Sequence, residues 1–346
     1  MNKQYRFILL VFVFELIAST TYAQSPQFPL VSGSWIGGDG AYSITLNDTT
    51  RLWLFGDTWV GQIKDNKRYN ATMVNNSVAI DRPAKPMQYY VRSPKTAIFI
   101  NPRKGEWYWP SDGICINNIL YVLVSRLYMK DSTNKTGFGF ANAGQDMAVV
   151  HLDGKQPTEW IINYNPIPEN TPRLGVAVTR DERYVYLFGD DNTIKHTTYL
   201  ARVPVANMGN LSGLEYYHPK TKQWKKEFST DIYLFDAAPE FSVRYDPEIK
   251  KWIVIYTRKG MSKDIAMRTA KNITGPWSDE RVIAECPEMA WNKNYYAYEA
   301  KQIAPLKGDN TNKLILTYLV NALSLWDVAN DTRIYVPQVL TLDKTF

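Results

Sequence analysis

Cysteine and histidine are scarce in this sequence of 346 residues, which contains two cysteines and three histidines. Cys115 and Cys286 lie far apart in apolar surroundings, so the sequence allows either two buried thiols or one bridge formed in an oxidising compartment, and it favours the thiols. His151, His196 and His218 belong to no cluster of Asp, Cys and His. A metal site built on histidine and a Ser-His-Asp triad therefore lack the residues that they need.

Dense runs of lysine or arginine are also missing. Without its first 23 residues the chain has 38 basic and 33 acidic residues, a net charge of +5. This mild charge, with no basic run, gives no reason to expect binding to nucleic acid. Beyond the N-terminal segment no apolar run reaches the length of a membrane-spanning helix, so we expect no stable insertion into a membrane.

Residues 1–23 have the pattern of a secretory signal peptide. A basic start precedes an apolar stretch over residues 7–18, and small residues lead to a cleavage site after Ala23. The pattern predicts a secreted or periplasmic chain that begins at Gln24 after cleavage. Glu15 interrupts the apolar stretch, which leaves a short amphipathic anchor as the alternative.

Five apolar, aromatic and β-branched runs recur in the remaining chain, with starts 62 to 68 residues apart. They are RLWLFGDTW from Arg51, ILYVLVSRLY from Ile119, YVYLFGDDN from Tyr184, KWIVIYTRKG from Lys251 and KLILTYLVN from Lys313. Each follows a polar turn and another short apolar strand, so each predicts a β-hairpin. A period of this length suits a four-stranded blade, and residues 24–346 then form one catalytic domain, an all-β, five-bladed β-propeller.

A β-sandwich and a phosphate-binding motif are the two alternatives to this interpretation. A β-sandwich with similar hairpins would give the same alternation of residues, since helical periodicity is nearly absent. The glycine-rich segment GFGFANAGQD, residues 137–146, lacks the spacing and the following helix of a phosphate-binding motif. We expect that segment to be a loop.

Acidic residues recur where the predicted inner strands begin. A propeller gathers the starts of its inner strands around one mouth of a central channel. The residues at these five places are Asp39, Asp112, Arg173, Glu240 and Glu299. Crowded carboxylates repel one another and must be paired or partly protonated, which favours a functional set over isolated turn residues, although each one alone could serve a turn.

The first hairpin places two of its acids opposite one another. Its turn, Asn47-Asp48-Thr49-Thr50, pairs residues whose numbers sum to about 96, and Asp39 and Asp57 satisfy this rule. Two opposed carboxyls titrate as a coupled pair, so we expect one raised pKa and one ionised group, the division between general acid and general base or nucleophile. The alternative makes Asp57 a turn cap like Asp190, whose context FGDD resembles FGDT.

The two segments around these acids, GGDGAYSITL and LWLFGDTW, resemble the opening of glycoside hydrolase family 183, whose characterised members are endo-D-arabinanases. The resemblance extends more loosely over most of the mature chain. It implies a five-bladed propeller with Asp39 and Asp57 as the catalytic pair. Many five-bladed furanosidases instead take a glutamate acid from a middle blade, which would favour Glu240 or Glu299 over Asp57.

The sequence therefore predicts a glycoside hydrolase that cleaves furanoside-containing polysaccharide, most specifically D-arabinan from within the chain. Asp39 and Asp57 are the predicted catalytic residues, and the chain is expected to act as a monomer without a cofactor, with a Ca²⁺ ion held by channel oxygens as an option. The predicted substrate-binding residues are Trp59, Asp112, Arg126, Arg173, Glu240, Glu299 and Lys301, and the candidate stacking platforms are Trp35, Trp59, Trp107 and Trp109. The rival interpretations are a glycan-binding propeller without catalysis and a scaffold for protein partners.

Overall fold

The computed structural model describes residues 26–93, 95–133, 139–169, 171–191, 193 and 195–344. The predicted signal peptide, residues 1–23, lies outside the described residues. In the described part of the chain no helix is long and apolar enough to cross a membrane.

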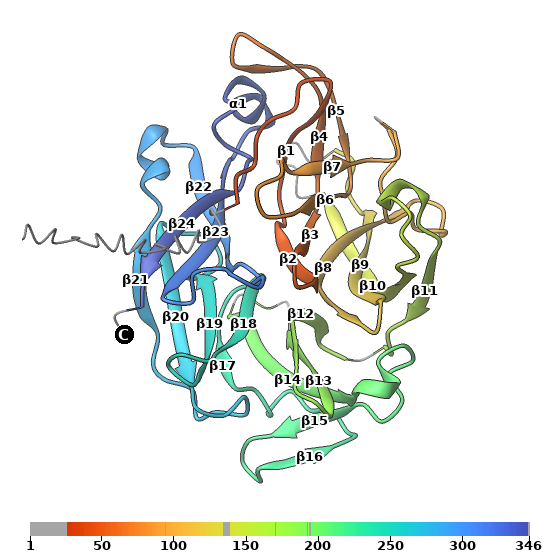
Figure 1. Cartoon of the computed structure of the whole chain (residues 1–346), viewed down its shortest axis with the longest axis vertical. Helices are drawn as coiled ribbons and strands as arrows, with labels where there is room; N and C mark the ends of the chain where they lie inside the picture. The colour runs from red at the N-terminus through yellow and green to blue at the C-terminus, as the bar shows by residue number, and fades with distance from the viewer. Residues whose placement is uncertain are drawn as a thin grey trace, which may run out of the picture.

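The described chain is built from six antiparallel sheets (Figure 1). One sheet has the order β1 (Ser34–Gly38), β4 (Thr58–Lys64), β5 (Lys67–Val74). The next has the order β2 (Tyr42–Asn47), β3 (Thr50–Phe55), β6 (Ser77–Asp81), β7 (Gln88–Tyr90). A third has the order β8 (Glu106–Ile116), β9 (Ile119–Met129), β10 (Phe140–His151), β11 (Ile162–Pro166).

The remaining sheets follow in chain order. The fourth runs β12 (Arg173–Arg180), β13 (Tyr184–Asp190), β14 (Thr197–Pro204), β15 (Glu215–His218), β16 (Gln223–Lys225), with β17 (Phe235–Asp236) paired to β14. The fifth runs β18 (Phe241–Asp246), β19 (Lys251–Thr257), β20 (Asp264–Ala270), β21 (Arg281–Glu285). The last runs β22 (Tyr295–Gln302), β23 (Lys313–Ala322), β24 (Gln338–Asp343). The helical elements are α1 (Leu325–Asn330) and three 3₁₀ turns at Pro157–Glu159, Val205–Asn207 and Pro287–Trp291.

All five predicted hairpins are present, as the pairs β2–β3, β8–β9, β12–β13, β18–β19 and β22–β23. Local sequence explains why the chain reverses at the second pair. Asn117 and Asn118 both adopt positive φ, 49° and 64°, the conformation that a two-residue type I′ turn requires and that asparagine tolerates. Such turns match the right-handed twist of the flanking strands, so the hairpin forms from local interactions.

Two expectations about strand boundaries were wrong. The run RLWLFGDTW is not one strand, because the chain turns at Gly56 and passes from β3 into β4 of another sheet. The glycine-rich segment 137–146 is not a loop over its described part, since β10 already begins at Phe140. Strand β10 pairs with β9 along its length and carries a bulge between Asn142 and Gly144, where a glycine relieves the local geometry.

The sheets stand around a common centre, with β2, β8, β12, β18 and β22 innermost (Figure 1). Contacts between these inner strands run in series from β2 through β8, β12 and β18 to β22. The two ends of the series also meet, because the Ala304 N–H donates to Ser43 Oγ at 2.8 Å and the Arg51 Nε–H donates to the Ala304 carbonyl at 2.7 Å. Arg244 of β18 fills part of the centre and reaches the Ser43 carbonyl at 2.9 Å.

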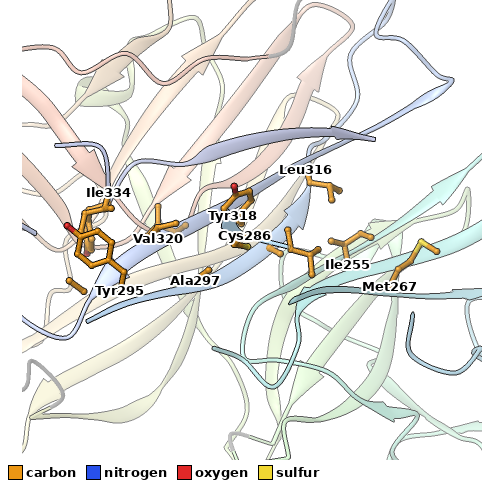
Figure 2. Close-up of a cluster of buried hydrophobic side chains, with 14 of the residues drawn as sticks. Ile255, Met267, Cys286, Tyr295, Ala297, Leu316, Tyr318, Val320 and Ile334 are labelled. Carbon is orange, nitrogen blue, oxygen red and sulfur yellow. The ribbon is translucent and has the colours of Figure 1, made fainter. Parts of the chain in front are cut away.

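Apolar clusters fill the spaces between neighbouring sheets. Figure 2 shows one of them, in which Ile255 and Met267 of the fifth sheet face Leu316 and Tyr318 of the last. Another cluster joins Trp53 and Phe55 of β3 to Ile303 and the partly buried Ile315 and Val339 near the C-terminus, so the first and last hairpin sheets pack together. Burial of this apolar area is the main force that holds the sheets together.

Both cysteines are free thiols, as the sequence favoured. Cys286 lies in the apolar cluster of Figure 2, where burial raises the pKa of its thiol to about 12. Cys115 is half-buried on β8, in a different sheet.

Candidate active site

A cavity of about 500 Å³ opens where the inner strands begin. Five of the predicted catalytic and substrate-binding residues line it, two of them from strands β12 and β22 and three from turns beside the strands. These residues are Asp39, Asp57, Arg173, Glu240 and Glu299. Aromatic and aliphatic side chains complete the wall, including Trp109, Phe140, Tyr296 and Met261.

Asp39 and Asp57 face one another, which confirms the pairing rule from the sequence. The register runs through Gly38 opposite Thr58 and Tyr42 opposite Leu54, so both pairs sum to 96. The Asp39 N–H donates to the Asp57 carbonyl at 3.3 Å, and the Gly56 N–H donates to the Asp39 carbonyl at 2.8 Å. The two carboxyls therefore leave the same short segment of paired backbone.

The Asp39 carboxyl is held by neutral donors. The hydroxyls of Tyr298 and Tyr335 donate to its Oδ2 at 3.1 and 2.9 Å. Burial, with a further contribution from the charge of Asp57, raises the pKa of Asp39 to about 7. Because the two hydroxyl hydrogen bonds lower the pKa only in part, a proton stays on this carboxyl in weakly acidic solution.

The Asp57 carboxyl has a different surrounding. The Trp109 Nε1–H donates to its Oδ1 at 2.9 Å, and the Asn75 side chain also hydrogen-bonds to it. Burial raises the pKa of Asp57 to about 6, and both hydrogen bonds lower it from a higher value. The sequence predicted one raised pKa and one ionised carboxyl. In the structure burial raises the pKa of both groups, and that of Asp39 further.

Glu299 forms a second layer beneath the pair. Its Oε2 accepts the Gly40 N–H at 2.7 Å and lies 3.8 Å from the Lys301 Nζ. Burial, together with the charges of Asp39 and Glu240, raises the pKa of Glu299 well above its ordinary value. Burial lowers the pKa of Lys301, which contacts the face of a tyrosine ring rather than the cavity.

Three residues beside Asp39 have strained backbone. Ala41, Glu299 and Tyr335 all have positive φ, 43°, 60° and 59°. Each costs on the order of 1 to 3 kcal/mol for a residue with a β-carbon, so surrounding structure must hold it there. Strain of this kind is typical of functional sites, and here it aims Glu299 at Gly40 and Tyr335 at Asp39.

Gly56 keeps the space that the Asp39 carboxyl occupies. A β-carbon at this position would lie 2.6 Å from Asp39 Oδ1, while the φ of Gly56 itself suits any residue. We expect Gly56→Ala to displace the carboxyl and lower kcat by roughly 10- to 100-fold, because small misplacements of catalytic groups are costly.

The matched control is Gly209→Ala, where the added β-carbon makes only ordinary contacts, at 3.5 Å from Tyr121. Steady-state kinetics and thermal unfolding of both variants check the prediction. Unchanged kcat in Gly56→Ala would show that the Asp39 position has no part in turnover.

Four predicted binding residues do not line this cavity. Asp112 is buried in a bulge of β8, and its two oxygens accept the N–H groups of Gly113 and Val178, both at 2.9 Å. Burial raises the pKa of Asp112 to about 6. Because both of its oxygens bind backbone N–H groups, this carboxyl holds the fold together and does not face the cavity. Lys301 is buried and lies 3.8 Å from Glu299. Trp59 packs against the apolar cluster of Figure 2.

Arg126 lines a neighbouring cavity instead. Its Nη2 donates a hydrogen bond to the Ala143 carbonyl. Arg173 lines both cavities. It stands opposite the fully buried Asp190 and forms an ion pair with it at 3.3 Å. Asp190 is therefore not a simple turn cap, because it pairs with a guanidinium at the wall of the cavity.

The candidate stacking tryptophans separate into two groups. Trp109 lines the cavity and packs edge-on against Phe140, with ring centroids 4.6 Å apart. Trp35 is buried in the core and stacks on Tyr89 at 4.3 Å. Neither Trp35 nor Trp107 is among the residues that line the cavity.

Sequence reasoning missed the two tyrosines that bind Asp39. Tyr298 precedes Glu299 in the segment YYAYEA, and its alternation with Tyr296 on β22 could have indicated a shared face. Tyr335 follows α1 in an irregular segment, and no pattern in the sequence connects it with Asp39.

In the part of the chain that the structure describes, no group of three or more His, Cys, Asp or Glu residues has the arrangement of a metal site. A Ca²⁺ ion bound by channel oxygens stays an untested prediction.

A family described as a domain of unknown function, DUF5005, matches residues 27–338. The chain belongs to the DUF5005 family. No curated protein matches this DUF5005 chain. The description of the matching family does not name glycoside hydrolase family 183, which the sequence resembles, so that assignment stays a prediction.

Solved structures resemble the DUF5005 fold along most of its length. A candidate hydrolase from Bacteroides ovatus matches with a TM-score of 0.72 and 19% identity, over 89% of this chain and 86% of that one. A family 43 β-xylosidase/α-arabinofuranosidase from a compost metagenome matches with a TM-score of 0.52 and 13% identity, over 93% and 94%. A family 43 enzyme from Xanthomonas citri, complexed with xylotriose, matches with a TM-score of 0.51 and 14% identity, over 94% and 90%. The DUF5005 chain thus has the all-β fold of propeller glycoside hydrolases.

Proposed function

We propose that this DUF5005 protein is a glycoside hydrolase in which Asp39 is the general acid and Asp57 the ionised partner. The observation that carries the proposal is the pair itself. Two carboxyls face each other at the wall of one cavity, and their surroundings raise their pKa values to about 7 and about 6. Glycosidases use two carboxyls with separated protonation states in this way.

In the proposed reaction the two carboxyls and the donors around them have separate roles. Protonated Asp39 gives its proton to the oxygen of the departing sugar, and the hydroxyls of Tyr298 and Tyr335 then stabilise the carboxylate that remains. Ionised Asp57 stabilises the positive charge that develops at the anomeric carbon, and it either activates a water molecule or attacks that carbon. The Trp109 Nε1–H fixes the Asp57 carboxylate for this role.

The proposed substrate is a polysaccharide that contains furanosides, with D-arabinan cleaved from within the chain as the first candidate. Support comes from the resemblance of GGDGAYSITL and LWLFGDTW to the endo-D-arabinanases of family 183. The family 43 neighbours include an enzyme named for xylosidase and arabinofuranosidase activity. The protein would act on this substrate as a monomer and without a cofactor.

We further propose five blades. Support comes from five repeated hairpins and from apolar clusters that join each hairpin sheet to the next, including the first to the last. The sheet β1–β4–β5, which contains none of these hairpins, then extends the first blade, β2–β3–β6–β7, and brings Gly38 and Thr58 beside the catalytic pair.

Export is part of the same proposal, since a polysaccharide of this kind is met outside the cytoplasm. We expect mass spectrometry of protein secreted by its native host to show a chain that begins at Gln24. A secreted chain that retains residues 1–23 would contradict this.

The experiment that tests the proposed function is incubation of the protein with arabinans, galactans and xylans, followed by measurement of new reducing ends. Release from arabinan is expected, and it should be lost in Asp39→Asn. A glycan-binding propeller without catalysis would bind one of these polysaccharides and release no reducing ends from any.

A further inference from the structure

A second cavity, of about 370 Å³, lies beside the first. Its walls are the start of β10, residues 166–169 and 171–172, and the end of β13. Asn142 and Arg173 line both cavities, so the two hollows share a wall. Nothing in the reaction proposed above uses the second cavity.

We propose that the second cavity binds another neutral sugar unit of the same polysaccharide chain whose bond is cut beside Asp39. This inference rests on the proposed function, which it extends by a second binding site. Its volume falls in the range of about 300 to 1,000 Å³ that small-molecule sites occupy.

Charge decides the class of ligand. Two guanidinium groups line the second cavity, from Arg126 and Arg173, and three carboxyls line it with them, from Glu169, Asp190 and Asp191. The acidic excess disfavours uronate, phosphate and sulfate groups, because a like charge placed near carboxylates is repelled. A neutral sugar, whose hydroxyls both donate and accept hydrogen bonds, suits a wall that offers N–H donors and carboxylate acceptors.

Donors are available on both arginines. Arg126 directs its Nη2 to the Ala143 carbonyl and its Nε lies 3.6 Å from Glu106. Arg173 directs its Nη2 to Asp190 and to the Pro239 carbonyl. Among the hydrogen bonds of the described residues both arginines donate through Nη2, and the buried Nε of each has no hydrogen-bond partner. The two side chains are 19% and 17% exposed. Partly buried guanidinium donors of this kind gain from a ligand hydroxyl.

Part of the wall of the second cavity is apolar. Pro166, Ile167, Pro168 and Pro172 line it. A sugar ring presents C–H groups on its faces and hydroxyls at its edge, so it can pack on prolines and hydrogen-bond to the arginines together. An apolar wall with a few placed polar groups is the usual composition of a small-molecule site.

Chain length should therefore control activity. An oligosaccharide long enough to reach both cavities gains binding energy that a disaccharide cannot use. Ala143→Trp and Thr171→Trp each add a bulky ring to the lining of the second cavity, from two different segments of the chain, and neither residue lines the first. Ile161→Trp is the matched control, because Ile161 is 73% exposed and already apolar.

The test measures kcat/KM on an arabinan oligosaccharide series from disaccharide to octasaccharide, with thermal unfolding to verify folding of each variant. We expect wild type and Ile161→Trp to prefer the longer chains by at least about tenfold, the ratio that about 1.4 kcal/mol of binding energy provides. In both obstructed variants that preference should fall to about twofold or less, with disaccharide turnover kept. If one variant does not fold, the other decides the result.

Two outcomes separate this inference from the proposed function. If wild type cleaves the series without regard to length, or if both folded variants keep the preference for long chains, the second site is refuted and the hydrolase stands. If wild type cleaves none of the oligosaccharides, the proposed function fails. Calorimetric binding of the same series to wild type and variants then decides the second site, which requires tighter binding of long chains that is lost on obstruction.

Discussion

Asp39→Asn and Asp57→Asn are each expected to lower kcat by at least about 100-fold, since general acid and base catalysis alone contributes roughly 10² to 10⁴. The amide keeps the shape of the carboxyl, but it cannot deliver a proton or stabilise positive charge. The loss should fall on kcat with little change in substrate binding. Stopped assays with purified variants on arabinan check it.

Asp39→Asn, which lowers kcat, should not lower the stability of the fold. Its folded pKa of about 7 lies above its ordinary value of 3.8. The stability linked to this group is therefore fully present below about pH 4 and is lost as the pH rises through 7. At pH 8 the wild type holds a buried carboxylate that Asp39→Asn lacks, so the variant should unfold at an equal or higher temperature.

Asp246→Asn is the matched control, because Asp246 is 2% exposed and lies at the far end of β18. It accepts the Glu248 and Ile249 N–H groups and pairs with Lys344, so its loss should lower stability and leave kcat unchanged. Full activity of Asp57→Asn together with an inactive Glu240→Gln or Glu299→Gln would move the second catalytic role to a later sheet.

Arg68→Ala is expected to destabilise the fold by about 3 to 5 kcal/mol, since each buried acceptor left without a donor costs about 1 to 3 kcal/mol. The Arg68 guanidinium donates to the carbonyls of Ile36, Val328, Asp331 and Ile334. It thereby ties β1 and α1 to the segment that presents Tyr335 to Asp39. The unfolding temperature should fall by roughly 5 to 10 °C.

The control for this variant is Arg333→Ala, in the same segment. The Arg333 side chain is 64% exposed and pairs with Asp331 at 2.7 Å, so its loss should cost less than about 1 kcal/mol. Calorimetry of both variants measures the difference. Equal effects would show that the four carbonyl contacts of Arg68 do not hold this segment.

The sequence predicted the hairpins and the acid pair because both depend on local pairing. Alternation of apolar residues defines a strand pair, and the sum rule that places Tyr42 opposite Leu54 also places Asp39 opposite Asp57. It did not predict that the run after Arg51 divides at Gly56, since nothing in residue propensity distinguishes one strand from two that enter different sheets.

The side chains that bind the two carboxyls could not be predicted from the sequence, because they come from distant parts of the chain. Trp109, Tyr298 and Tyr335 reach the two carboxyls from other sheets, and only the closed arrangement brings them there. Asp112 shows the converse. It occupies the predicted place in its repeat, but a bulge turns its carboxyl onto backbone N–H groups and away from the cavity.

The pH dependence of kcat/KM on arabinan tests the central claim most directly. Activity should rise as the pH passes about 6, the pKa at which Asp57 loses its proton. It should fall as the pH passes about 7, because Asp39 then loses the proton that it must donate. The account predicts a narrow bell with its maximum between these two values. A profile that stays flat from weakly acidic to alkaline solution would contradict the assignment of Asp39 and Asp57 as the catalytic acid and its ionised partner.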